Sequence, residues 1–314
     1  MIDINDIQAA GQRIAKYVKH TPLEYSNSLS RYLGFDTFVK FEIFQKTGAF
    51  KARGGFNKLL SLTDEERFRG VVAVSGGNHA QAVAYASQVL GVRAVIVMPE
   101  STPANYVEAT RGYGATVDLQ PTISDAFAKI EEYRNDGMVF VHPFEDPLVM
   151  AGQGTIGLEI VEDLPEVTDV IVSIGGGGLA GGVGTAIRSL RPDARVWGVE
   201  TVGADAMSRA LAAGRPVELS AITSIAKTLG APSVTEASLA VTQKYLESVT
   251  VVTDDEAVGS LYFILERLKV VTEPAASCTL AAAKRLKGNF GHESKVVLVF
   301  CGGNISAADM CSFL

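Results

Sequence analysis

The sequence predicts an α/β fold with two open, mostly parallel twisted sheets flanked by helices, and three observations support this fold class. Short β-branched runs without polar alternation recur along the chain, which is typical of strands covered on both faces. Amphipathic stretches of helical length separate these runs, as in parallel α/β sheets. The 314 residues, 47% of them apolar, also suffice for two hydrophobic cores at roughly 150 residues each.

Each expected strand is a short apolar run, and these runs occupy 71–74, 94–97, 139–141, 170–174, 196–199 and 296–300. The clearest helical patterns occupy 80–90, 125–134, 181–190, 257–269 and 275–286. No low-complexity linker or short repeat interrupts this alternation, so any boundary between domains must be made by packing rather than by a linker. We expect a small mobile domain over 69–144 and a large domain built from 1–68 and 145–314, with the N-terminal segment packed onto the C-terminal half.

The charge balance and the N-terminus argue against several classes of function. Lys and Arg total 28 against 35 Asp and Glu, and the net charge of -7 argues against nucleic acid and anionic membranes as partners. Residues 1–6 lack the basic and apolar segments of a secretory signal, and no stretch is long and apolar enough to span a bilayer. The three cysteines show no spacing for zinc or a disulfide framework. We expect a cytoplasmic protein whose ligand is a small molecule.

Three loops rich in glycine and polar residues directly follow expected strands, at 75–79, 175–179 and 301–304. In open parallel sheets, ligands bind outside the carboxyl ends of the strands, where such loops converge. We therefore expect the three loops to line one cleft.

The loop 175–179 contains four consecutive glycines between a strand and a helix. Without Cβ atoms, its backbone N–H groups can approach a phosphate at the positive end of the helix, although a hinge is an alternative. A sharper alternative is a nicotinamide dinucleotide site, because Gly176, Gly178 and Gly181 satisfy G-x-G-x-x-G and Glu200 lies about twenty residues further on. The mid-chain position of the loop argues against the dinucleotide.

The loop 75–79 opens the next helix, so its N–H groups and the Ser75 hydroxyl can receive a carboxylate. The Asn78 side chain can hydrogen-bond a ring hydroxyl, although an N-cap with an Asx turn would explain the same residues. The chain has only four histidines, none paired at ligand spacing, so the His79 side chain is expected to be structural rather than a metal ligand or a base.

Lys51 stands between Phe50 and Arg53, behind the Thr47-Gly48 turn. A lysine held against apolar surface near another cation loses proton affinity and becomes a nucleophile toward carbonyls. Taken alone, the segment would also fit a solvated surface lysine. Together with the two loops, it predicts an amine presented for covalent chemistry.

The order of these segments resembles the fold-type II pyridoxal phosphate enzymes, in the threonine dehydratase and serine racemase branch. The resemblance covers essentially the whole chain. It rests on Lys40-x-Glu42-x-x-Gln45 with Gly48-Ala49-Phe50-Lys51-x-Arg53-Gly54, on Ser75-Gly-Gly-Asn78-His79, on 175–179 and on Cys301-Gly-Gly-Asn304. It implies a tryptophan synthase β-like fold, pyridoxal 5'-phosphate bound in the large domain, and a homodimer.

The resemblance also implies roles for the matching residues. Lys51 would be the Schiff-base lysine beside Phe50, and Cys301 would lie next to the pyridine nitrogen. A neutral thiol there suits elimination, which needs less of an electron sink than transamination, although an ordinary buried cysteine is the alternative. The phosphate would be held by Gly175, Gly176, Gly177, Gly178 and Leu179. Asn78 would contact the ring hydroxyl of the cofactor. The substrate carboxylate would be bound by Ser75, Gly76, Asn78 and His79.

Two departures from the family pattern concern proton transfer and metal binding. Gly76 stands where serine racemases carry a second acid-base serine, so racemisation is not expected as the main activity. A cation site of some relatives maps to Glu200 and the Ala204 carbonyl, but Ala206 replaces its aspartate and Asp205 lies one residue early. The two alternatives for this position are a site for Mg²⁺, Ca²⁺ or a monovalent cation, and a glutamate at a strand end that binds no metal.

We therefore expect a pyridoxal phosphate-dependent lyase that converts a β-hydroxy amino acid such as L-threonine or L-serine to a 2-oxo acid and ammonia. Phenylserine and 3-hydroxyaspartate are alternative substrates, because an Asp-Gly pair common in relatives is missing after 223–229 and Asn105-Tyr106 replaces residues that are often basic. A serine racemase or β-replacement enzyme of the same fold, and a nicotinamide-dependent oxidoreductase, are the alternative functions. No regulatory domain follows Leu314, so a catabolic role is expected.

Overall fold

A computed structural model describes residues 1–313, and its strands form two sheets. The larger sheet has the strand order β1-β2-β10-β7-β8-β9, and every pairing in it is parallel except that of β1 with β2. Its strands are β1 (Leu23–Tyr25), β2 (Asp36–Lys40), β7 (Asp169–Ser173), β8 (Arg195–Thr201), β9 (Ser248–Val252) and β10 (Lys295–Val299). The smaller sheet is parallel with the order β5-β4-β3-β6. Its strands are β3 (Val71–Val74), β4 (Ala94–Pro99), β5 (Thr116–Gln120) and β6 (Val139–Phe140). The predicted fold class is confirmed.

Helices connect and cover the strands. The α-helices are α1 (Ile4–Ile14), α2 (Asn27–Leu33), α3 (Lys51–Leu60), α4 (Asp64–Arg69), α5 (Asn78–Leu90), α6 (Ala104–Gly112), α7 (Ile123–Asn135), α8 (Pro147–Asp163), α9 (Gly178–Leu190), α10 (Ala206–Ala213), α11 (Glu236–Tyr245), α12 (Asp254–Leu268), α13 (Pro274–Arg285) and α14 (Ala307–Ser312). Short 3-10 turns are η1 (Glu42–Phe44), η2 (Lys46–Gly48), η3 (Lys227–Leu229) and η4 (Lys287–Asn289). None of the helices found in residues 1–313 is long and apolar enough to cross a membrane.

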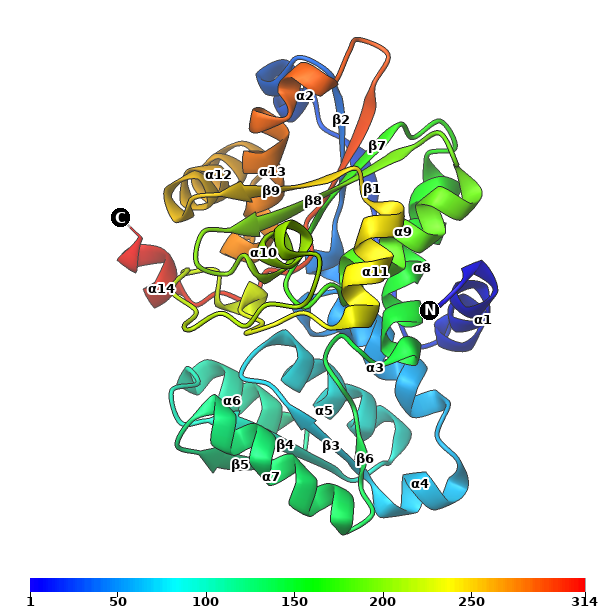
Figure 1. Ribbon diagram of the computed structural model, residues 1–314, viewed down its shortest axis with the longest axis vertical. Helices are drawn as coiled ribbons and strands as arrows, with labels where there is room; N and C mark the ends of the chain where they lie inside the picture. The colour runs from blue at the N-terminus through cyan, green and yellow to red at the C-terminus, as the bar shows by residue number, and fades with distance from the viewer. Residues whose placement is uncertain (314) are drawn as a thin grey trace.

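The central strands are buried on both faces, which explains their unbroken apolar sequences. Val170 and Val172 of β7 pack with α8 and α9 in one hydrophobic cluster. Ile171, between them, points to the other face and packs with α12 and α13 in a second cluster. Figure 1 shows these two helical layers on opposite sides of the larger sheet. Alternate side chains of one strand thus contribute to two separate cores.

The smaller sheet is covered in the same way, by α5 and α6 on one face and α7 on the other. With these helices it lies apart from the larger sheet, and α3 lies where the two parts meet (Figure 1). We propose that these elements form a small domain over 69–144 that moves as a unit.

The chain direction places three loops where the two sheets face each other. Loop 75–79 follows β3, loop 175–179 follows β7 and loop 301–304 follows β10. β2 pairs with β10 in parallel, with Phe38 opposite Val297, so the segment leading to Lys51 leaves the larger sheet beside the end of β10. The N-terminal segment therefore meets the last strand of the chain.

Candidate active site

Lys51 is the first residue of α3 and lies beside the loop that follows β10. Ala49 forms an isolated antiparallel bridge with Gly302, and the Phe50 N–H donates to the Cys301 carbonyl at 3.0 Å. The start of α3 is therefore fixed to the end of the larger sheet by backbone contacts.

The Lys51 side chain is half-buried, and its amine lies between apolar surface and a carbonyl group. Its Nζ donates to the Pro143 carbonyl at 2.7 Å and lies 5.1 Å from the centre of the Phe50 ring. Burial lowers the pKa of Lys51 to about 8, although the neighbouring Cys301 and Glu273 act to raise it. At pH 7 roughly a tenth of the amine is then neutral, far more than for an ordinary lysine. A neutral amine of this kind can act as a nucleophile or a base.

The glycine loop ends in an uncapped and buried helix N-terminus. Gly177, at φ 95, turns the chain into α9 in a left-handed conformation that favours glycine. No side chain caps α9, and its first residues Gly178, Leu179 and Ala180 are buried. Their N–H groups are the orphan donors of a helix start, and the helix dipole makes this end positive. The residues present therefore fit a phosphate group.

Loop 75–79 provides a second uncapped helix start. The Ser75 Oγ accepts from the Gly77 N–H at 3.1 Å, and Gly77 is the N-cap of α5 without a side-chain cap. Asn78 and His79 occupy the buried first turn. An anion such as a carboxylate can bind to the free N–H groups of this turn.

The His79 imidazole is bonded to a backbone carbonyl. Its Nε2 lies 2.9 Å from the Val141 carbonyl, so Nε2 carries the proton and Nδ1 is an acceptor. Burial lowers the pKa of His79 to about 3, which keeps the imidazole neutral. His79 can therefore bind an anion only through its backbone.

A chain of hydrogen bonds fixes the orientation of the Asn78 amide. The Asn304 Nδ2 donates to the Asn78 Oδ1 and to the Thr47 carbonyl, both at 2.7 Å. On its other side, the Asn78 Nδ2 donates to the Glu273 Oε1 at 2.8 Å. A flipped Asn78 amide would place its nitrogen against the Asn304 nitrogen and its oxygen against the Glu273 oxygen. One N–H of the Asn78 amide is left for a ligand.

Glu273 is a buried carboxyl of the site that the sequence analysis did not identify. It is only 3% exposed, and its Oε1 also accepts from the Thr228 hydroxyl at 3.1 Å. Its Oε2 is buried without a partner in the described part of the chain. Burial raises the pKa of Glu273 to about 7, although hydrogen bonds from Thr228 and Asn78 and the charge of Lys51 act to lower it. In the sequence, Glu273 before Pro274 resembles an ordinary helix start, which hid this contact.

Cys301 lies at the end of β10 as a buried thiol. Its Sγ faces the Ala275 carbonyl at 3.6 Å, and burial raises the pKa of the thiol well above its ordinary value. The thiol is therefore neutral, as the proposed role beside a ring nitrogen requires.

Glu200 lies within β8, and its carboxylate faces the start of α10. Its Oε1 and Oε2 accept from the N–H groups of Met207 and Ser208, both at 2.8 Å, and burial raises the pKa of Glu200 to about 7. Both oxygens bind the start of α10 and the Glu200 side chain is fully buried, which argues against a contact with a ribose and so against the nicotinamide alternative. A cation at Glu200 and the Ala204 carbonyl stays a prediction, and residues 1–313 contain no cluster of three acidic, His or Cys side chains placed to hold a metal.

Glu273→Gln is expected to change how stability depends on pH. A carboxyl whose pKa rises from 4.5 to about 7 on folding stabilises the protein below pH 4.5, and this contribution is lost as the pH rises through 7. The loss amounts to about 3 kcal/mol. Relative to wild type, the variant should therefore gain stability from pH 5 to 8 in urea unfolding of the cofactor-free protein.

The matched control is Glu24→Gln, which changes an exposed carboxyl on β1. This variant should follow the wild-type pH dependence. Parallel stability curves for wild type and Glu273→Gln would show that the carboxyl titrates normally.

Comparisons with known proteins agree with this geometry. The model of a family described as pyridoxal-phosphate dependent enzyme matches residues 14–302. An L-threonine ammonia-lyase of Thermotoga maritima is 42% identical over 97% of this chain and 76% of its own length. The catabolic L-threonine dehydratase of Escherichia coli is 40% identical over 97% of this chain and 93% of its own. The structure of maize serine racemase matches with a TM-score of 0.94 and 36% identity, over 99% of this chain and 96% of that one.

Proposed function

The chain belongs to the family of pyridoxal-phosphate dependent enzymes, and on that basis we propose that it converts L-threonine or L-serine to a 2-oxo acid and ammonia. The observation that carries the proposal is the Lys51 amine, with a pKa of about 8, whose hydrogen-bond partner Pro143 precedes Phe144, and Phe144 packs on Gly176 and Gly178 at an uncapped helix start that can bind a phosphate. The relatives named as threonine ammonia-lyase and threonine dehydratase support this reaction.

Four parts of the site would hold the cofactor. Lys51 would bind it covalently through Nζ, and the first turn of α9 would bind its phosphate. The remaining N–H of Asn78 would meet the ring hydroxyl, and the neutral Cys301 thiol would face the ring nitrogen. When bound, pyridoxal phosphate supplies an electron sink that acidifies the α-hydrogen of an amino acid.

The other steps belong to residues of the chain. The first turn of α5 would hold the substrate carboxylate, and Lys51 as a free neutral amine would accept the α-proton. A pKa near 8 suits a base that works near neutral pH. The α-proton and the β-hydroxyl together make up the one water that is lost, and hydrolysis of the released enamine takes up one water. The net products are therefore a 2-oxo acid and ammonia in equal amounts.

The products released from each substrate test this function. Cofactor-loaded protein is incubated with L-threonine, L-serine, phenylserine and 3-hydroxyaspartate, and 2-oxo acid, ammonia and D-serine are measured. We expect equal amounts of 2-oxo acid and ammonia from L-threonine and L-serine. Abundant D-serine with little pyruvate would instead support a racemase, and a thioether product from L-serine and a thiol would support β-replacement.

We further propose that the protein acts in the cytoplasm as a homodimer. The mass in solution, measured by light scattering, should be twice that of the chain. A monomeric mass with full activity would contradict the dimer.

A further inference from the structure

A hydroxyl on the loop after β4 lies against the loop proposed to bind the substrate carboxylate. The Thr102 Oγ1 is buried and has no hydrogen-bond partner within residues 1–313. A Cβ added at Gly76 would lie 2.6 Å from this oxygen. The Thr102 hydroxyl therefore occupies the space that a side chain at position 76 would need.

The topology brings these two loops together at the site. β3 and β4 are parallel neighbours with Val74 opposite Val97, so the loops that follow them leave the same edge of the sheet. Tyr106, four residues after Thr102, donates through its hydroxyl to the Asn304 carbonyl, and the Asn304 side chain binds Asn78. The start of α6 therefore faces the site.

The Thr102 hydroxyl has no structural task at the helix it precedes. Pro103 is the N-cap of α6, and no side chain caps that helix. A buried hydroxyl without a partner destabilises the folded protein, because its hydrogen bonds to water are lost and not replaced. The hydroxyl has one proton to donate, and the free N–H groups beside it at the start of α5 are donors as well.

We propose that the Thr102 hydroxyl donates a hydrogen bond to the carboxylate of the amino-acid substrate, together with the first turn of α5. The inference rests on the proposed function and adds a residue that determines substrate binding. The carboxylate is the matching group because donors converge at a positive helix end, where an anion accepts charge-assisted bonds. For the substrate carboxylate to enter, the Thr102 hydroxyl has to move away from Gly76.

The test compares ligands with and without a carboxylate. Thr102→Val removes the hydroxyl and keeps the shape of the side chain, whereas Thr102→Ser keeps the hydroxyl. L-alanine has the carboxylate but no leaving group, and ethanolamine has no carboxylate. In the valine variant, the inhibition constant of L-alanine and the KM for L-serine should rise about 10- to 100-fold, the effect of one hydrogen bond to a charged group. Inhibition by ethanolamine should stay the same, and the serine variant should resemble wild type.

Thermal unfolding of the cofactor-free protein provides a readout that does not depend on activity. The melting temperature of Thr102→Val should be equal to or above that of wild type, because an unsatisfied polar group has been removed. A lower melting temperature that serine restores would show a structural hydroxyl and overturn the inference. Unchanged inhibition by L-alanine in a valine variant that still releases 2-oxo acid would overturn it while leaving the proposed function intact. A wild-type protein that releases no 2-oxo acid would overturn both.

Discussion

Lys51→Ala is expected to lower the turnover of L-threonine and L-serine by at least about 10³-fold, because one amine is proposed both to bind the cofactor and to accept the α-proton. The burial that lowers the pKa of Lys51 to about 8 is what makes the amine available near neutral pH. The variant should also lack the cofactor absorbance that borohydride fixes to the wild-type chain. Release of 2-oxo acid and peptide mapping of the reduced cofactor are the measurements.

The fold should survive this substitution. Desolvation disfavours the charged form of Lys51, so removal of the amine removes a cost, against the loss of the bond to the Pro143 carbonyl and of the contact with the Phe50 ring. We expect the cofactor-free variant to melt at or above the wild-type temperature, as for a residue kept for function rather than stability.

The matched control for this variant lies on the same helix. Lys58→Ala removes a lysine whose Nζ pairs with Asp146 at 2.7 Å. It should retain turnover and cofactor. Wild-type turnover in the Lys51 variant, or a cofactor fixed to another lysine, would contradict the role of Lys51.

Strands covered on both faces could be predicted from the sequence. The runs 170–174 and 296–300 coincide with β7 and β10 within one residue, because burial on both faces leaves no polar positions. The strands that no apolar run predicted include β1, β5 and β9, which lie at sheet edges. β5 and β9 are partly exposed and carry polar residues, so their sequences lack a strong apolar signal.

The candidate site was predictable only where the sequence is locally unusual. Loop 175–179 and the Lys51 segment stand out through glycine runs and an aromatic ring beside a lysine. Glu273 and Thr102 do not stand out, because their contacts with Asn78 and Gly76 join residues distant in the chain. The unpartnered oxygen of each residue becomes visible only when both packed elements are known.

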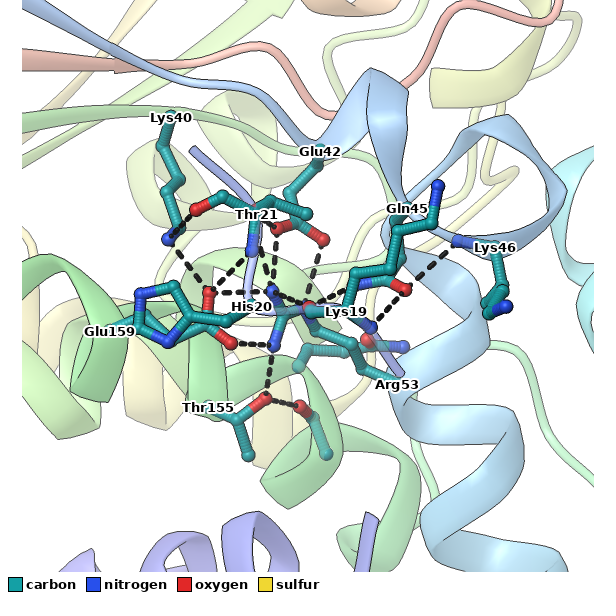
Figure 2. Close-up of polar contacts among 12 residues, drawn as sticks. Lys19, His20, Thr21, Lys40, Glu42, Gln45, Lys46, Arg53, Thr155 and Glu159 are labelled. Carbon is teal, nitrogen blue, oxygen red and sulfur yellow. Dashed lines mark hydrogen bonds and ion pairs between the residues drawn. The ribbon is translucent and has the colours of Figure 1, made fainter. Parts of the chain in front are cut away.

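A second large effect is expected at Arg53, two residues after Lys51 on α3. The guanidinium group is fully buried and pairs with two carboxylates. Its Nε and Nη2 contact Glu42 at 2.8 and 2.7 Å, and its Nη1 and Nη2 contact Glu159 at 2.6 and 2.8 Å. Figure 2 shows this arrangement between η1, α3 and α8.

The ion pairs around Arg53 are also linked to the N-terminal segment, through Lys40. The Lys40 Nζ lies 2.7 Å from the Glu159 Oε2 and donates to the Thr21 carbonyl at 2.6 Å. Burial acts to lower the pKa of Arg53, but Glu42 and Glu159 outweigh burial and hold the pKa above its ordinary value. Arg53 is therefore a permanent charge that compensates both carboxylates.

Arg53→Met is expected to destabilise the protein by about 3–5 kcal/mol, because the fully buried Glu42 would be left as an uncompensated charge and Glu159 would keep only its ion pair with Lys40. Arg209→Met is the matched control, since Arg209 also pairs with a carboxylate, Asp205 at 3.0 Å, but at the surface. The control should cost roughly 0–1 kcal/mol. Urea unfolding of the cofactor-free proteins measures both, and similar midpoints would mean that the buried network contributes no more than a surface pair. Because Arg53 anchors the start of α3, its variant should also fix less cofactor to Lys51 with borohydride, whereas the Arg209 variant should fix as much as wild type.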